Sequence, residues 1–159
     1  MRTYFSELLL NSMQYDPKVW LLTGDLGFGV LNKIRETIPN RAFNVGAAEQ
    51  LMLGTAVGLS HNNQIPVCYS ITPFVIFRAF EWIRNYMNHE GAPVKLVGAG
   101  RDRDYGHLGF SHWGEDDSQA LSIFPKIKIY KPNTNDELKL IWEEFLYNDT
   151  PSYLNIRRA

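Results

Sequence analysis

The sequence has a single cysteine, Cys68, and it lacks the long apolar runs of membrane and secreted proteins. One cysteine excludes an internal disulfide framework. Cys68 lies in the apolar run 65–69, so we expect a buried small hydrophobic residue there, not a nucleophile. No stretch of about 18 apolar residues is present to predict a membrane span. The first residues have no signal-peptide-like apolar segment, so a cytoplasmic location is the expectation.

The charge shows no excess of either sign. Lys and Arg number 16 against 17 Asp and Glu, which gives a net charge of −1. Because these charges are interspersed, neither a nucleic acid nor an anionic membrane surface is an expected partner. No internal repeat, low-complexity tract or linker is visible either, so the sequence predicts one domain over residues 1–159.

What is present is a large share of apolar residues arranged in alternating elements. The hydrophobic fraction is 45%, enough for a substantial core. Short apolar runs predict strands, while apolar residues at helical spacing predict helices. The predicted strands are 19–23, a short strand that leads to Gly46, 65–70, 94–97, 127–130 and 153–156. The predicted helices are 4–13, 48–60, 75–88 and 135–146.

This alternation indicates an α/β fold, a doubly wound and mostly parallel sheet of about six strands with helices on both faces. The runs 127–130 and 153–156 alternate between apolar and polar residues, so we expect both nearer a sheet edge. Thr134 is the predicted N-cap of the last helix. The stretch 98–117 is the longest without predicted structure, and a loop of that length in a compact domain is usually functional.

Three segments carry chemically informative residues. In the first, Glu49 falls in the first turn of a helix rich in small residues, where the residues alone indicate a helix stabiliser. In the second, Phe74, Phe77 and Phe80 recur every third residue, which suits either a core stripe or stacking on a flat ligand. The third is the glycine-rich loop that contains His112.

The first segment resembles a family signature. Residues 43–59 read Phe-Asn-Val-Gly-x-x-Glu-Gln-x-x-x-Gly-x-Ala-x-Gly-Leu, which is similar to the pyrimidine-binding domain of thiamine-diphosphate-dependent transketolases. The loop 106–117 resembles the family's Gly-x-x-Gly-x-Thr/Ser-His-x-x-x-Glu-Asp, with one residue fewer after His112, which indicates an altered substrate side. The resemblance extends over nearly the whole chain.

The resemblance implies roles for individual residues. It makes Glu49 and His112 catalytic: Glu49 contacts the aminopyrimidine ring and His112 faces the reacting carbon of the substrate. The remaining implied positions are Phe74, Phe77, Phe80, Asp25 and Leu26 for cofactor binding, and Arg2, Arg158 and Ser111 for substrate binding.

The implied activity is transfer of a two-carbon ketol or acyl unit through a C2 carbanion of thiamine diphosphate, activated by Glu49. Two positions depart from the family. Leu108 stands where many transketolases have an acidic residue, and Gly29 stands in place of a serine. Both departures count against the usual ketose-phosphate substrate. His107 has no counterpart in the family pattern.

The sequence also lacks Gly-Asp-Gly with a following asparagine, the family's element for binding the diphosphate and Mg²⁺. No metal ligand is therefore expected in this chain, and Mg²⁺ is expected on a diphosphate-binding partner subunit that carries Gly-Asp-Gly. The expected assembly is a homodimer of this chain within a heterotetramer. Whether the chain is a natural subunit or an excised domain stays open.

Two other functions stay open from the sequence. One is the small subunit of a split thiamine-dependent decarboxylase of the phosphono- or sulfopyruvate type, and the other is a non-catalytic module that retains the fold. A Rossmann dinucleotide site is excluded, because the glycines of 24–29 do not match G-x-G-x-x-G.

Overall fold

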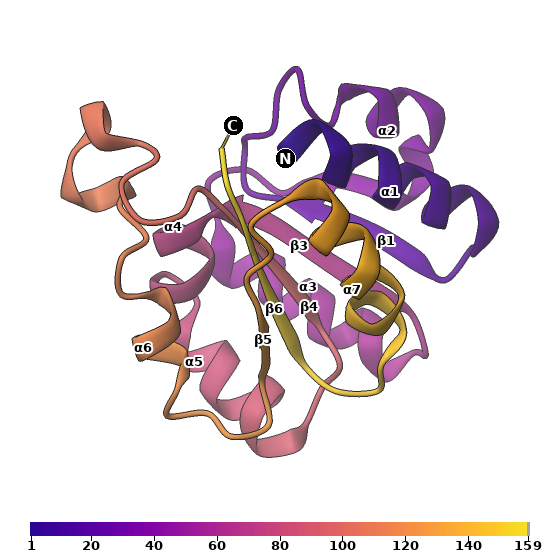
Figure 1. Cartoon of the computed structure of the whole chain (residues 1–159). Coiled ribbons are helices and arrows are strands. Elements are labelled where there is room, and N and C mark those ends of the chain that lie inside the picture. The colour runs from indigo at the N-terminus through magenta and orange to yellow at the C-terminus, as the bar shows by residue number, and fades with distance from the viewer. Residues whose placement is uncertain (159) are drawn as a thin grey trace.

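A six-stranded sheet forms the centre of the computed structural model, which describes residues 1–158 (Figure 1). The strand order is β2-β1-β3-β4-β6-β5, and every pairing is parallel. The strands are β1 (Val19–Thr23), β2 (Ala42–Asn44), β3 (Ile65–Ile71), β4 (Lys95–Ala99), β5 (Lys128–Tyr130) and β6 (Ser152–Ile156). The predicted fold class is confirmed.

Helices cover both faces of the sheet (Figure 1). The α-helices are α1 (Arg2–Tyr15), α2 (Asn32–Thr37), α3 (Glu49–His61), α4 (Thr72–Phe77), α5 (Phe80–Trp82), α6 (Asp117–Leu121) and α7 (Asn135–Tyr147). Further helical segments are the 3₁₀ helices η1 (Pro39–Arg41), η3 (Gly106–Leu108) and η4 (Phe110–His112), and the π-helix η2 (Ile83–Glu90). The loop that protrudes at the upper left of Figure 1 contains η3 and η4.

Successive residues of each strand point to opposite faces and so divide the core into two layers. Leu21 faces the layer that contains α1 and α7, whereas its neighbour Leu22 faces the layer that contains α3 and α4. Cys68 lies in the second layer and is fully buried, as predicted. Burial on both faces explains why the central strands read as continuous apolar runs.

Two sequence predictions need correction. The helix predicted over 75–88 is not continuous, because α4 ends at Phe77 and the backbone leaves the helical region at Ala79 before α5 begins. The strand β6 is not half-exposed at an edge: it lies between β4 and β5, and its polar residues Ser152 and Asn155 are fully buried. Only β5 is the edge strand on that side of the sheet.

The strand order reverses direction between β1 and β3, because the chain goes outward from β1 to β2 and then returns to β3 on the other side of β1. In open α/β sheets ligands bind at such a switch point, beyond the carboxyl ends of the strands. The segments that follow β1, β2 and β3 therefore frame the expected site.

Candidate functional site

The carboxylate of Glu49 lies at this switch point and is almost completely buried. Gly46 has a positive φ of 79° that turns the chain from β2 toward α3, and Glu49 is the first residue of that helix. The residue is 2% exposed. Ser70, near the end of β3, donates a hydrogen bond from Oγ to Oε1 of Glu49 at 3.0 Å. A buried carboxylate is stable only when it is paired and hydrogen-bonded, and this one is.

Arg78 supplies the opposite charge. Its Nη1 lies 3.0 Å from Oε2 and 3.2 Å from Oε1 of Glu49, and its guanidinium carbon lies 3.6 Å from the centre of the Phe74 ring. The Arg78 side chain is 45% exposed, in contrast to the 1% of Glu49. The pair therefore joins a buried anion to a cation at the surface.

The end of β1 leaves space for this carboxylate. A Cβ atom on Gly24 would stand 2.9 Å from Oε1 of Glu49, closer than atoms of this kind approach. The predicted cofactor residues Asp25 and Leu26 follow directly. Asp25 exchanges hydrogen bonds with the side chain of Asn44, and the carbonyl of Leu26 accepts one from Arg35 at 2.6 Å. Neither of them lines the cavity described next.

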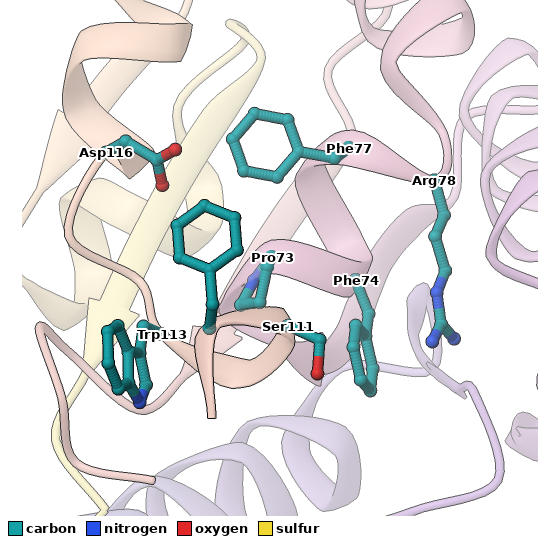
Figure 2. A pocket seen from close by; sticks show the side chains of 8 residues that line it. Pro73, Phe74, Phe77, Arg78, Ser111, Trp113 and Asp116 are labelled. Atoms are coloured by element: carbon teal, nitrogen blue, oxygen red, sulfur yellow. The ribbon is translucent and has the colours of Figure 1, made fainter. Parts of the chain in front are cut away.

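A cavity of about 440 Å³ opens beside Arg78 (Figure 2). We call it the α4 cavity, because α4 forms one wall and the segment around η4 forms the other. Its lining residues are Pro73, Phe74, Phe77, Arg78, Phe110, Ser111, Trp113 and Asp116. Most of them are apolar, which suits a flat ring with a small number of polar groups.

The three predicted phenylalanines do not line one surface. Phe74 and Phe77 line the α4 cavity, whereas Phe80 packs against Phe124 with ring centroids 5.1 Å apart. The break at Ala79 turns Phe80 away from the other two rings and into the hydrophobic layer. Spacing alone predicted a shared face because it assumed an unbroken helix.

His112 lies at the edge of the same cavity. Its ring meets Phe74 edge-on, with centroids 4.9 Å apart and an interplanar angle of 67°. Its Nδ1 lies 3.0 Å from Oγ of Ser111, which itself lines the cavity. His107, by contrast, is exposed in η3 and does not line it.

The two predicted substrate arginines are in contact, and one of them lies against Tyr105. Arg2 donates a hydrogen bond from Nε to the carbonyl of Arg158 at 2.8 Å. The guanidinium of Arg158 lies 5.0 Å from the centre of the Tyr105 ring, and that ring is 6.3 Å from the ring of His112. Neither arginine lines the α4 cavity, and Tyr105 lies near both the Arg158 guanidinium and the His112 ring at the cavity edge.

The acidic residues after His112 take places that the sequence did not indicate. Glu115 pairs with Arg103 at 2.7 Å, whereas Asp116 lines the cavity and Asp117 is fully buried. The acidic pair nearest the site is thus Asp116-Asp117. With that pair, three residues follow His112, as in the family pattern, and aspartate replaces its glutamate.

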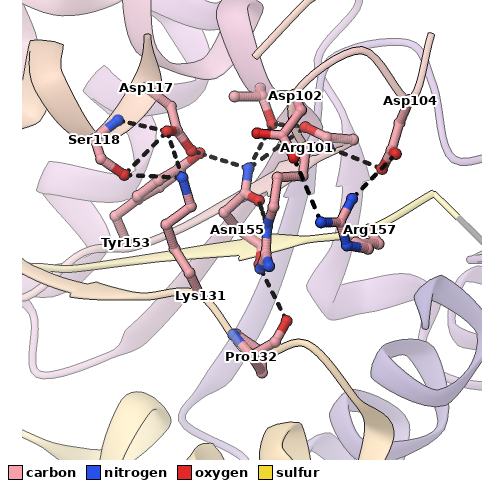
Figure 3. A network of polar contacts seen from close by, with 12 residues as sticks. Arg101, Asp102, Asp104, Asp117, Ser118, Lys131, Pro132, Tyr153, Asn155 and Arg157 are labelled. Atoms are coloured by element: carbon pink, nitrogen blue, oxygen red, sulfur yellow. Dashed lines mark hydrogen bonds and ion pairs between the residues drawn. The ribbon is translucent and has the colours of Figure 1, made fainter. Parts of the chain in front are cut away.

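A buried polar network supports the start of α4 (Figure 3). Tyr153 donates from its hydroxyl to Asp117 at 2.9 Å and accepts from Asn155 at 3.0 Å. Asn155 also donates to Oγ1 of Thr72, the first residue of α4, at 3.1 Å. Burial and, secondarily, the charge of Asp117 raise the pKa of Tyr153 well above its ordinary value, so its hydroxyl stays a donor. The network fixes the start of α4 relative to β6.

Sequence reasoning missed Ser70, Arg78, Tyr105 and Asp116. Ser70 carried a usable signal, since it stands near the carboxyl end of a predicted central strand. Arg78 and Tyr105 carried no such signal in the sequence, because a long or large side chain can turn toward many neighbours. Their contacts appear only when the segments are assembled.

Within residues 1–158, no group of three or more His, Cys, Asp and Glu side chains could hold a metal ion. The same part of the chain contains no helix that is both long and apolar enough to cross a membrane.

Comparisons with known proteins identify the family. The sequence matches the family described as transketolase, pyrimidine binding domain, over residues 1–159. It is similar to the 6-deoxy-6-sulfo-D-fructose transketolase subunit SqwH of Clostridium sp. (strain MSTE9), with 28% identity over 99% of this chain and 49% of the relative. It is also similar to a subunit of the apulose-4-phosphate transketolase of Actinobacillus succinogenes, with 31% identity over 74% of this chain and 38% of the relative.

A solved structure described as a split gene transketolase, inactive beta4 tetramer, has a TM-score of 0.86 and 26% identity, over 99% of this chain and 51% of that one. The chain thus spans about half the length, or less, of these relatives. The family match covers the complete sequence, and the strand arrangement agrees with it. This chain belongs to the family of transketolase pyrimidine-binding domains.

Proposed function

We propose that this chain is the pyrimidine-binding subunit of a split, thiamine-diphosphate-dependent transketolase-like enzyme. The observation that carries the proposal is the buried carboxylate of Glu49 beside an apolar cavity that also borders His112. Family membership supports the type of cofactor, and relatives described as subunits or as a split-gene enzyme support the role as a subunit.

The residues present fit an aminopyrimidine ring. Phe74 and Phe77 offer apolar faces in the α4 cavity, and such faces hold a flat heteroaromatic ring well. Glu49 offers a carboxyl group that is shielded from water by α3 and β3. In that setting a hydrogen bond to a ring nitrogen is stronger than in water.

Bound thiamine diphosphate would supply the nucleophilic carbon that attacks a substrate carbonyl. In this proposal the chain holds a proton at the ring nitrogen, and we assign that proton to Glu49. Ser70 orients the Glu49 carboxyl through its 3.0 Å hydrogen bond. We assign to His112, which is half-exposed at the cavity edge, the transfer of a proton on the substrate oxygen.

The diphosphate and Mg²⁺ belong to a partner chain in this proposal. Magnesium prefers oxygen ligands in octahedral geometry, and the described residues provide no cluster of acidic side chains that could hold it. We therefore assign metal binding to a partner subunit that carries Gly-Asp-Gly. A dimer of this chain within a heterotetramer is the proposed assembly. The solved relative is described as an inactive tetramer of beta chains, which supports association between copies of such a chain and leaves the heterotetramer to be tested.

Substrate binding is assigned to Ser111 at the cavity and to Arg2 and Arg158 beyond Tyr105. Arg2 contacts the backbone of Arg158, and two arginines this near in the fold suit an anionic group on the substrate. Leu108 is 45% exposed and offers no acid there, so we propose a substrate other than the common ketose phosphates.

The test is reconstitution with the partner. The chain is co-expressed with a neighbouring gene product that carries Gly-Asp-Gly and a distant asparagine, and ketol transfer is measured with a panel of ketose donors. We expect turnover only when both chains, thiamine diphosphate and Mg²⁺ are present. A stable complex that shows no cofactor-dependent turnover on any donor would contradict the proposal.

A further inference from the structure

Arg78 contacts the same two groups that the proposed pyrimidine ring requires. Its guanidinium donates to both carboxylate oxygens of Glu49 and at the same time covers the face of Phe74 at 3.6 Å. A guanidinium is planar, cationic and rich in N–H donors. A protonated aminopyrimidine shares these three properties, so the two groups present the same surface to Glu49 and Phe74.

Both groups cannot occupy this place at once. The 3.6 Å separation is a direct contact, and it leaves no space for a second flat group between Arg78 and that ring face. Oε1 already accepts from Ser70, and Arg78 donates to both Oε1 and Oε2. A ring that stacks on this face of Phe74 and bonds to Glu49 must therefore displace the guanidinium.

The position of Arg78 makes this displacement feasible. It is the residue that follows α4, at the break before α5, and its side chain is 45% exposed. A long side chain that is partly in solvent can move without repacking the core. Glu49 has no such freedom, because its side chain is 1% exposed and would be left as an unpaired buried charge if Arg78 were absent.

We propose that Arg78 is an exchangeable counter-ion of Glu49, which neutralises the buried carboxylate until an aminopyrimidine ring replaces it. This inference rests on the proposed function, since it assumes that Glu49 receives the ring. It adds that cofactor binding includes the breaking of an internal ion pair, so Arg78 competes with the ligand.

The test uses the full chain and the free compound 4-amino-5-hydroxymethyl-2-methylpyrimidine, with binding measured by NMR chemical-shift titration. We expect Arg78→Ala to bind the compound about fivefold more tightly than the unmodified chain, as the loss of a partly exposed competing ion pair predicts. Arg78→Lys retains a positive charge on a group that is not planar. Its affinity for the compound should therefore lie between those of Arg78→Ala and the unmodified chain. Arg84→Ala is the matched control, because Arg84 is exposed on η2, bonds to Asn85 and should leave binding unchanged.

The outcomes separate this inference from the proposed function. Equal or weaker binding by Arg78→Ala, together with weaker binding by Glu49→Gln, overturns the exchange and leaves Glu49 as the ring's partner. Unchanged binding by Glu49→Gln, or no binding by any variant, overturns both. The NMR spectra report at the same time whether each variant is folded.

Discussion

Gly24 shows how closely the chain is fitted around Glu49. A Cβ atom there would stand 2.9 Å from Oε1 of Glu49, so a larger residue must push the carboxylate away from Ser70 and Arg78. We expect Gly24→Ala to lower the free energy of unfolding by about 1–3 kcal/mol, as overpacking does. Urea denaturation of the isolated chain measures this change.

Gly58 provides the matched control for Gly24. It lies within α3, and a Cβ atom on it would meet no atom within 4 Å. Gly58→Ala should therefore stabilise the chain by about 0.5–1 kcal/mol, because alanine favours the helix more than glycine does. If both alanine variants stabilise the chain, the space at Gly24 is not needed for Glu49.

The sequence allowed part of this site to be predicted at the level of single residues. The places of Glu49, Phe74 and Phe77 follow from short-range order, since each stands on the helix that follows a strand. The ion pair with Arg78 did not follow, because residues 49 and 78 meet only when α3 and α4 pack on the same face of the sheet.

At the scale of elements, the start of α7 could be predicted from the sequence, whereas the break after α4 could not. The helix α7 was predicted almost correctly because its start signal is local. Thr134 accepts a hydrogen bond from the backbone N–H of Glu137 at 3.1 Å. The break after α4 has no local signal, since neither glycine nor proline stands at 78–80. It coincides with tertiary contacts, with Arg78 held by Glu49 and Phe80 by Phe124.

The cap at Thr134 gives a direct test of this local account. Thr134→Ala removes the acceptor for the Glu137 N–H and should lower the free energy of unfolding by about 1 kcal/mol. Thr134→Ser retains the hydroxyl oxygen, so its free energy of unfolding should fall much less. Thermal or urea unfolding measures both, and equal losses in the two variants would show that the methyl group, not the cap, contributes the stability.

The strand β6 is an element for which periodicity failed. Alternation of polar and apolar residues predicted exposure on one face. Instead Asn155 is buried, because it bonds to Tyr153 and Thr72 in the network at the start of α4. A sequence pattern does not distinguish a polar residue that faces water from one that faces buried partners.

At the scale of the whole molecule, the end of the sheet opposite the site contains its own buried charge. Lys95 is 1% exposed, and its Nζ donates to the carbonyls of Asn148 and Thr150 at 2.7 and 2.8 Å. Burial lowers the pKa of Lys95 from 10.5 to about 7. As pH rises, the folded chain thus releases this proton at a lower pH than the unfolded chain does.

This difference predicts a dependence of stability on pH. Between about pH 7 and about pH 10 the unfolded chain binds more protons at this position than the folded chain, so the contribution of Lys95 to the free energy of unfolding rises with pH. We expect Lys95→Met to remove that rise. Urea midpoints at about pH 7 and about pH 9.5 measure it, with the exposed Lys139→Met as control. A variant that keeps the full pH dependence of the unmodified chain contradicts the assignment.

The chain spans about half the length of relatives that it matches, and its apolar site is open on one side. Phe77 and Phe110, which line the α4 cavity, are 44% and 77% exposed. Exposed apolar rims of this kind mark contact surfaces. In the proposed function, this chain forms one wall of a site that another chain completes.

The most direct test of this account is the turnover of the reconstituted assembly when Glu49 is replaced by glutamine. Glu49→Gln keeps the shape of the side chain and removes the acid, so we predict a loss of thiamine-diphosphate-dependent turnover by a factor of about 10² or more. The matched substitution Glu81→Gln, at an exposed position of α5, should leave turnover unchanged. Turnover by Glu49→Gln within about twofold of the unmodified assembly would contradict the central claim that this acid serves the pyrimidine ring.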